Sequence, residues 1–393
     1  MRMPLRIAYV SDRPFPSFWT DTQQVMKNAE ALALAGAEVR LAIPRAYRSI
    51  VRPAARRHRA LREFYGVSAS LDLQDILTIP CTPARLEKWP HALVAQRRAA
   101  LAGCDLLYSR NLFPAWLAAR RRSRVVYETH RRFDAASGLK ARAFLDLAGR
   151  RELVGVVTNS EYVRESLLRA GVGADRVLSS KLGHDPRDFA ARLTKVEACQ
   201  ALALDPRRPL AVYAGHVDAT KGIDALLAIA GLLPDVGFLL VGGSRIASAA
   251  LAVRARRMGL SNVSTRPRVP PRAVVPYLYA SDILINPPSS TLLAFPHTIT
   301  PIKLYNYLAA GRPIVAGRTP DVAELLTHDV DALLCRPDDP HAAADAIARV
   351  LRTPELAARL AASALETSAR YTWEERGRRI LRFIQARLDE GRS

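Results

Sequence analysis

The residues between Thr298 and Ala316 offer the clearest chemistry in the sequence, because a Thr-Pro pair is followed by a lysine and then by Ala-Ala-Gly-Arg-Pro. Thr300 is a good N-cap and Pro301 suits the first helical position, so a short helix is predicted to begin here. Its free N–H groups, the positive end of its dipole and Lys303 would together bind a phosphate. An ordinary capped helix with a solvated lysine accounts for the same residues, so this segment alone does not distinguish a phosphate site from such a helix.

A second segment, Leu210–Asp224, has the same character. Its apolar run ends at Gly215, and a short loop leads to Lys221 and Gly222, which open the next predicted helix. Gly215 allows a ligand to approach the backbone, and Lys221 can counter a diphosphate. A solvated surface lysine is the simpler interpretation of Lys221 taken singly, but two such segments at strand-to-helix junctions together favour a phosphate-binding site.

The elements that must position these residues form a series of short apolar runs that alternate with longer amphipathic segments. That alternation is typical of parallel sheets with crossover helices, so the predicted fold class is α/β. The predicted strands of the first half are Leu5–Val10, Glu38–Ile43, Asp105–Ser109, Arg124–Glu128 and Val154–Asn159. Those of the second half are Leu210–Ala214, Val236–Val241, Ile283–Asn286, Pro313–Ala316 and Ala332–Cys335.

A chain of 393 residues is too long for one compact core, so two domains are expected. We predict an N-terminal doubly wound domain over 1–185, a Pro- and Asp-containing linker over 186–208 and a C-terminal doubly wound domain over 209–372. Residues 373–393 are predicted to form a basic helix that packs back toward the N-terminal domain, with Ile380, Leu381, Ile384 and Leu388 on its apolar face. Such sheets bind ligands at the carboxyl ends of their strands, so the chemistry is expected in a cleft between the domains.

The chain is strongly basic, with 58 Lys and Arg against 37 Asp and Glu and a formal net charge of +21. This charge predicts an anionic partner and leaves a nucleic-acid-binding protein open as an alternative, although no helix-turn-helix, zinc-finger or RRM-like pattern supports it. The four cysteines are widely spaced, which disfavours a zinc or redox site. No signal peptide or membrane-spanning run is recognised, so a cytoplasmic location is expected.

Several motifs resemble those of GT-B glycosyltransferases, in particular the retaining family 4 group. In the C-terminal half they are the strand–Gly–loop–Lys–Gly segment at 210–222, Val-Gly-Gly at 241–243, residues 279–287, the 300–316 segment and Tyr-Thr-Trp-Glu at 371–374. In the N-terminal half they are Val-Tyr-Glu-Thr-His at 126–130, Val-Thr-Asn-Ser-Glu at 157–161 and Gly-His-Asp at 183–185. The resemblance extends over nearly the whole chain.

The resemblance implies a GT-B fold and transfer of a sugar from a nucleoside diphosphate donor to an acceptor, with retention at the anomeric carbon. His130 is the implied catalytic residue, facing the donor sugar. Lysines and a helix N-terminus can stabilise the departing diphosphate, and no DxD motif occupies a strand end, so no metal and no cofactor besides the donor is expected. The implied donor-binding residues are Gly215, His216, Lys221, Thr298, Thr300, Lys303 and Asn306.

The sequence departs from the family at the site itself. The usual pair of glutamates, separated by seven residues, would fall at Thr298 and Asn306, and neither position carries a carboxylate. Asn306 can hydrogen-bond a ribose hydroxyl, but it cannot supply a charged acceptor. His216 stands where family members often have arginine. These departures leave a catalytically impaired GT-B-like binding protein open as a second alternative.

A basic stripe over Arg40–Arg62 contains eight arginines and no acidic residue, with apolar side chains interleaved. Such a segment suits an anionic membrane surface, although a solvated arginine-rich face is the competing interpretation. In a GT-B protein this segment would lie beside the acceptor entrance. We therefore predict a glycan or lipid-linked acceptor, as in cell-surface polysaccharide or glycoconjugate synthesis, and a peripheral location on the inner face of the plasma membrane. The predicted acceptor or membrane surface consists of Arg52, Arg56, Arg57 and Trp19.

Overall fold

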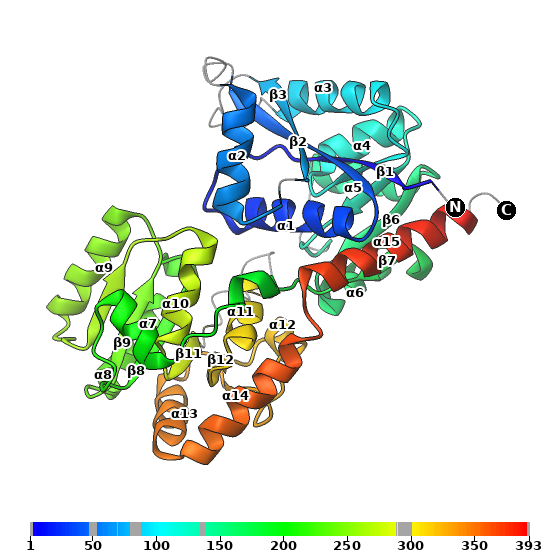
Figure 1. Cartoon of the computed structure of the whole chain (residues 1–393). Helices are drawn as coiled ribbons and strands as arrows, with labels where there is room; N and C mark the ends of the chain where they lie inside the picture. The colour runs from blue at the N-terminus through cyan, green and yellow to red at the C-terminus, as the bar shows by residue number, and fades with distance from the viewer. Residues whose placement is uncertain are drawn as a thin grey trace. The chain divides into compact units, whose positions relative to one another are not determined.

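The computed structural model describes residues 3–46, 53–68, 70–78, 88–133, 138–287, 289 and 301–390 of the chain. These residues fold into two compact units (Figure 1). Unit 1 comprises residues 1–181 together with 373–393, and unit 2 comprises residues 182–372. No helix in the described ranges is both long enough and apolar enough to cross a membrane.

Unit 1 is built on a seven-stranded parallel sheet in the order β3-β2-β1-β4-β5-β6-β7. Its strands are β1 (Arg6–Val10), β2 (Glu38–Ala46), β3 (Asp72–Thr78), β4 (Leu106–Ser109), β5 (Val125–Glu128), β6 (Leu153–Thr158) and β7 (Val177–Ser179). Its helices are α1 (Thr20–Leu34), α2 (Ala54–Tyr65), α3 (Lys88–Leu101), α4 (Leu112–Arg120), α5 (Gly138–Ala148), α6 (Glu161–Arg169) and α15 (Trp373–Glu390), with a short 3-10 turn η2 (Ala174–Arg176).

Unit 2 repeats this plan with a six-stranded parallel sheet in the order β10-β9-β8-β11-β12-β13. The strands are β8 (Leu210–Ala214), β9 (Gly237–Val241), β10 (Val263–Arg266), β11 (Ile283–Asn286), β12 (Ile314–Gly317) and β13 (Leu333–Cys335). The helices are α7 (Lys195–Leu202), α8 (Ile223–Leu232), α9 (Arg245–Arg257), α10 (Val275–Tyr279), α11 (Ile302–Ala310), α12 (Pro320–Ala323), α13 (Pro340–Arg352) and α14 (Pro354–Ser368). The 3-10 turns are η3 (Pro186–Phe189), η4 (Ala219–Lys221) and η5 (Pro271–Val274).

In each sheet the strands that follow the first one in sequence, β1 or β8, are added on both of its sides. The predicted α/β class with two doubly wound domains is therefore confirmed. In this topology the order reverses between β1 and β4 in unit 1 and between β8 and β11 in unit 2. Ligands of open α/β sheets bind outside the carboxyl ends of the strands at such a switch point. The sheet orders therefore mark two positions, one in each unit, where a ligand is expected.

The segment 186–208 differs from the predicted linker, because it folds as part of unit 2. Within it, η3 and α7 are regular turns of helix, and Thr194 and Glu197 form a capping box that starts α7. The Lys195 ammonium lies 2.8 Å from the carboxylate of Asp282, which precedes β11. Local capping and this ion pair fix the segment against the unit, and a linker would make no such contacts.

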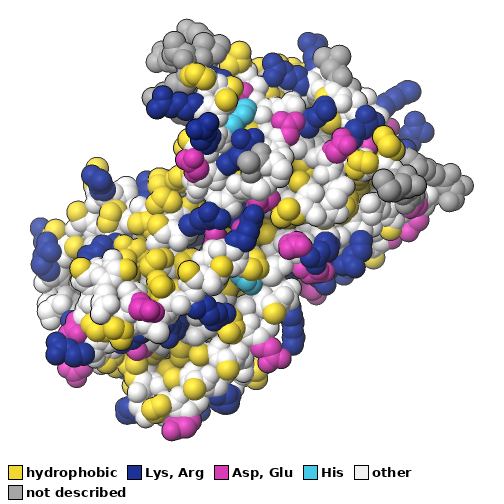
Figure 2. All heavy atoms as spheres, viewed as in Figure 1, with side chains coloured by type: hydrophobic (Ala, Val, Ile, Leu, Met, Phe, Trp, Pro, Cys, Tyr) yellow, Lys and Arg dark blue, Asp and Glu magenta, His cyan; other side chains and the backbone are white. Residues whose placement is uncertain are grey.

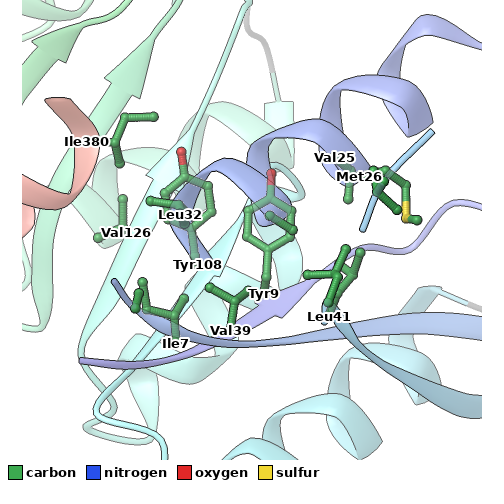
Figure 3. Packing of buried hydrophobic residues seen from close by; sticks show 14 of the residues in the cluster. Ile7, Tyr9, Val25, Met26, Leu32, Val39, Leu41, Tyr108, Val126 and Ile380 are labelled. Carbon is green, nitrogen blue, oxygen red and sulfur yellow. The ribbon is translucent and has the colours of Figure 1, made fainter. Parts of the chain in front are cut away.

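The C-terminal helix α15 belongs to unit 1, where it packs against α1 (Figure 1). Ile380, Leu381 and Ile384 are buried in the core that α1 and α15 form with the sheet, and Figure 3 shows Ile380 beside Val126 and near Leu32 and Tyr108. The helices approach so closely that a Cβ on Gly377 would lie 2.3 Å from the Ala31 carbonyl oxygen.

A buried ion pair joins α15 to the sheet. The Arg376 guanidinium lies 2.9 Å from Oε1 of Glu128, the last residue of β5, and both side chains are 1% exposed. The same guanidinium donates to the Asn28 side chain in α1 and to the carbonyls of Ser180 and Lys181. Tyr108 in β4 donates to the other Glu128 oxygen at 2.5 Å. One carboxylate therefore connects two strands, and through Arg376 and Asn28 it connects two helices.

Replacing Arg376 is expected to destabilise unit 1 strongly, because Arg376→Met leaves the buried Glu128 carboxylate without its closest cation. Breaking a buried pair from one side costs about 3–5 kcal/mol. All four tryptophans, Trp19, Trp89, Trp116 and Trp373, belong to unit 1, so tryptophan fluorescence during urea unfolding of the whole chain reports on this unit.

The matched control is Arg378→Met, two residues further along α15. Arg378 forms exposed pairs with Glu374 and Glu375, and its loss should cost less than about 1 kcal/mol. Equal stability of the two variants would contradict a structural role for the buried pair.

Candidate functional site

The carboxyl edge of the unit 2 sheet has unusually close backbone contacts at two glycines. A Cβ on Gly215 would lie 2.8 Å from the Tyr213 hydroxyl and 2.9 Å from Nζ of Lys303. Gly242, which follows β9 with a φ of +157°, would place a Cβ only 1.6 Å from the Gly215 carbonyl oxygen. A side chain is therefore excluded at Gly242, and one at position 215 would displace the Lys303 ammonium and the Tyr213 hydroxyl.

Lys303 lies at the start of α11 and reaches over this edge. Its ammonium nitrogen lies 3.9 Å from the centre of the Tyr213 ring, in a cation–π contact. Burial, and then the positive charge of Lys221, lower the pKa of Lys303 well below its usual range. Asp218 opposes this lowering, but among the described residues no carboxylate pairs with the ammonium, and a bound anion would stabilise its charged form.

Lys221 is carried to the same edge by a tight turn. Asp218 caps η4, accepting a hydrogen bond from the Thr220 amide at 3.0 Å, and Lys221 is the last residue of this turn. Gly222 follows with a φ of +69°, and a Cβ on it would lie within 2.8 Å of Pro287 and Ser289, just beyond β11. The turn thus brings Lys221 beside the switch point between β8 and β11.

His216 forms a basic cluster with the two lysines. Its carbonyl accepts a hydrogen bond from the Tyr213 hydroxyl at 2.6 Å. Burial lowers the pKa of the imidazole, and Lys221, Lys303 and Arg268 lower it further, while Asp218 opposes them. The structure therefore brings together Gly215, His216, Lys221 and Lys303, which are separated by up to 88 residues in the sequence.

The start of α11 differs by one residue from the prediction. Pro301 is the N-cap and not the first helical residue, because its ψ of 122° is extended. Thr298 and Thr300 lie outside the described residues. Asn306 is half-buried one turn after Lys303, on the same side of the helix.

The sequence did not point to the tyrosines that hold this edge in place. The Tyr307 hydroxyl accepts from the Ala214 amide at 2.8 Å and donates to the Ile285 carbonyl at 3.4 Å, which ties α11 to the ends of β8 and β11. Tyr213 contacts both Lys303 and the His216 backbone. Both residues lie at positions where the strand or helix pattern requires an apolar side chain. That pattern does not indicate that their hydroxyls form hydrogen bonds.

His130 follows β5 in unit 1, as predicted, but its ring is buried and held on both sides. Nδ1 accepts a hydrogen bond from Arg110 at 3.0 Å, so the proton is on Nε2, which donates to Glu128 at 2.7 Å. Burial, followed by the charge of Arg110, lowers the pKa of His130 to about 4. A catalytic role stays a prediction; in this geometry the neutral ring joins Arg110 to the Glu128 carboxylate.

Glu128 is ionised despite its burial. Burial raises the pKa of this carboxyl, but Arg376, the hydrogen bond from His130 and the charge of Arg110 outweigh it and hold the pKa well below the usual range. The carboxylate that fixes α15 therefore also orients the His130 ring.

The arginines of the basic stripe do not all face outward. Arg57 is only 14% exposed and pairs with Asp75 of β3, which also lies 3.0 Å from Arg45 and 3.3 Å from His58. Arg57 is therefore a structural residue and not part of an acceptor or membrane surface, because the fold brings a distant carboxylate to it. Arg56 is exposed on α2, and Trp19 is 64% exposed. Arg52 lies outside the described residues.

The net charge is also less concentrated than the sequence suggests. On the face seen in Figure 2, Lys and Arg side chains are spread over both units with Asp and Glu among them. Within the ranges that the structure describes, no group of three or more His, Cys, Asp or Glu side chains is arranged to hold a metal ion.

Comparison with known proteins supports the resemblance. Residues 208–353 match the model of the family described as Glycosyl transferases group 1. A D-inositol 3-phosphate glycosyltransferase from Xylanimonas cellulosilytica is 28% identical over 234 residues, which cover 56% of this chain and 54% of that protein. A GDP-mannose-dependent alpha-(1-6)-phosphatidylinositol dimannoside mannosyltransferase from Mycobacterium tuberculosis is 26% identical over 272 residues, 66% of each chain. The chain thus spans only about half the length of the first of these relatives.

Among solved structures, Anabaena HepE in complex with UDP-glucose matches with a TM-score of 0.73 and 19% identity. The match covers 97% of this chain and 100% of HepE. The likeness at this identity concerns the fold, which both units share with it. The chain therefore has the fold of the GT-B glycosyltransferases, and within unit 2 its residues 208–353 match the Glycosyl transferases group 1 family.

Proposed function

We propose that the chain transfers a sugar from a nucleoside diphosphate donor to a glycan or lipid-linked acceptor, with retention at the anomeric carbon. The observation that carries the proposal is the basic cluster of His216, Lys221 and Lys303 at the carboxyl edge of the unit 2 sheet. The UDP-glucose bound by Anabaena HepE supports a nucleotide sugar as donor.

The cluster would act on the leaving group. Negative charge grows on the diphosphate as the sugar departs, and preorganised cations stabilise that charge more than they stabilise the ground state. Lys221 and Lys303 would supply this stabilisation, aided by the free amides at the start of α11. No metal is required for this step in the proposal. Gly215 would let the diphosphate contact the backbone.

The acceptor is proposed from the relatives and from unit 1. Both curated relatives have names that specify an inositol-containing acceptor, either a phosphate or a phosphatidylinositol mannoside. The exposed Arg56 and Trp19 are the remaining candidates for contact with an anionic membrane or lipid-linked acceptor. A role in cell-surface glycoconjugate synthesis at the inner face of the plasma membrane follows as part of the proposal.

The direct test is an assay of donor hydrolysis and transfer over a panel of UDP, GDP and ADP sugars. Turnover with one donor is expected. NMR of the product should show that the anomeric carbon of the transferred sugar keeps the configuration that it has in the donor. Tight nucleotide binding with no turnover across acceptors would instead favour the catalytically impaired binding protein.

Replacing Lys221 should cripple turnover, because Lys221→Ala removes a countercharge from the departing diphosphate. Loss of one such group costs about 100-fold or more in kcat. The control is Arg257→Ala, an exposed residue in the last turn of α9 that removes the same charge from the same unit. Similar kcat values for the two variants would refute the assigned role.

Donor binding should be coupled to proton uptake. The pKa of Lys303 is lowered in the free protein by burial and by Lys221, and a bound diphosphate would raise it again. Between the pKa of Lys303 in the free protein and its pKa in the complex, the complex holds one more proton than the free protein. The affinity for the nucleotide should therefore fall as pH rises through this range. Calorimetry of UDP or GDP binding in buffers of different ionisation enthalpy measures the uptake directly.

The control for this titration is Lys303→Met, which should abolish most of the proton uptake as well as weaken binding. Proton release, or uptake that is unchanged in Lys303→Met, would contradict the coupling.

Membrane attachment is expected to depend on Trp19 and Arg56. The double variant Trp19→Ala/Arg56→Ala should reduce co-sedimentation with vesicles that contain anionic lipid, because each basic residue near such a surface contributes about 1 kcal/mol. Arg151→Ala, whose side chain is 85% exposed, is the charge-matched control. Co-sedimentation that is the same with anionic and neutral vesicles, and the same for the wild type and the double variant, would argue against a membrane surface here.

A further inference from the structure

Arginines follow three neighbouring strands at the carboxyl edge of the unit 1 sheet. Arg13 comes three residues after β1, Arg110 directly after β4, and Arg131 three residues after β5. These strands are adjacent and parallel, so their carboxyl ends share one edge. The edge includes the switch point between β1 and β4, where open α/β sheets bind ligands.

Arg13 and Arg110 converge on one acidic residue in the first turn of α1. The Arg13 guanidinium lies 2.7 Å from the Asp21 carboxylate, and Arg110 donates to the Asp21 carbonyl at 3.3 Å. Arg110 also donates to Nδ1 of His130, which fixes the guanidinium at the edge. The position of both arginines is therefore set by contacts within unit 1.

Arg131 adds a third guanidinium that the protein leaves exposed. Its main chain is held by Thr129, which accepts from the Arg131 amide at 3.1 Å, but its guanidinium has no hydrogen-bonding partner among the described residues. Burial lowers the pKa of Arg131, and the charges of Arg13 and Arg110 lower it further, so the three arginines act on one another electrostatically.

Two carboxylates balance the charge of this group of three arginines only in part. The Asp21 carboxylate pairs with Arg13 at 2.7 Å, and the buried Glu128 carboxylate lies 3.8 Å from Arg110 and pairs more closely with Arg376, at 2.9 Å. Within the described part of this edge, no carboxylate pairs with Arg131, and Arg110 shares its carboxylate with Arg376. Guanidinium groups bind phosphate oxygens through paired N–H donors, and such charge-assisted bonds are the strong ones.

We propose that Arg13, Arg110 and Arg131 form an anion subsite in unit 1 that recognises a phosphate group on the acceptor. This proposal rests on the proposed transferase function and specifies its acceptor class. The donor diphosphate would be held in unit 2, so the enzyme would bind two phosphorylated substrates through separate cationic groups. A neutral glycan acceptor would leave the three arginines without a ligand.

The test measures anion binding by calorimetry on the full chain. The soluble probe is sn-glycerol 3-phosphate, with glycerol as the neutral comparison. A short-chain phosphatidylglycerol, used below its micelle concentration, presents a lipid headgroup phosphate without a membrane surface. Whichever probe binds identifies the source of the phosphate as a free metabolite or a lipid.

Binding of at least one phosphorylated probe is expected, with none for glycerol. Arg131→Gln and Arg13→Gln should each weaken it by about tenfold or more, as loss of a charge-assisted hydrogen bond predicts. Arg151 precedes β6 and so lies at the opposite edge of the same sheet, and Arg151→Gln should bind as the wild type does.

Two outcomes would overturn the subsite: no binding of either phosphorylated probe, or binding that Lys221→Gln abolishes and Arg131→Gln leaves unchanged. The second result would place the phosphate in unit 2. A separate titration of the wild type with UDP, GDP and ADP tests the donor site. Failure there would contradict the proposed function while leaving the arginine result standing.

Discussion

The buried carboxylate of Glu128 is the interaction on which unit 1 depends. It ends β5, accepts a hydrogen bond from Tyr108 of β4, pairs with Arg376 of α15 and orients His130. A buried carboxylate without compensating partners would be protonated, but here Arg376, His130 and Arg110 keep it charged. The ion pair of this carboxylate with Arg376 therefore holds the C-terminal helix α15 in unit 1.

The same group has a consequence for chemistry at the carboxyl edge. Because Glu128 is shared between Arg376 and Arg110, it balances the charge of Arg110 only in part, and its hydrogen bond to His130 fixes that ring. In unit 2, the Lys303 ammonium contacts the Tyr213 ring, and no carboxylate within the described ranges pairs with it. Each unit thus holds positive charge at the point where its strand order reverses, which is where its topology favours a ligand.

Sequence reasoning predicted the central strands and missed three peripheral ones. The missed strands, β3, β7 and β10, all lie at sheet edges. An edge strand has a neighbouring strand on one side only, so fewer of its side chains need to be apolar. The burial of β10 alternates between half-buried and exposed residues, so it lacks the apolar run by which β8 and β9 were recognised. The apolar face of α15 was predicted correctly because Ile380, Leu381 and Ile384 follow helical spacing.

At the site, glycines and lysines at strand-to-helix junctions were predictable because local patterns specify them. Contacts between distant segments were not: nothing in the sequence of the basic stripe shows that Asp75 neutralises Arg57, or that Tyr307 ties α11 to β8. Likewise, Arg13, Arg110 and Arg131 became one group only when the sheet order placed β1, β4 and β5 side by side. Residues that act through tertiary contacts need the fold before their roles can be assigned.

The central claim is that the cationic edge of unit 2 holds a nucleoside diphosphate. Hydrogen–deuterium exchange of the full chain, with and without saturating UDP, GDP or ADP, tests it most directly. Amides at 215–222 and 302–306 are expected to exchange more slowly with the preferred nucleotide. Protection confined to other segments, or no protection with any of the three nucleotides, would contradict it.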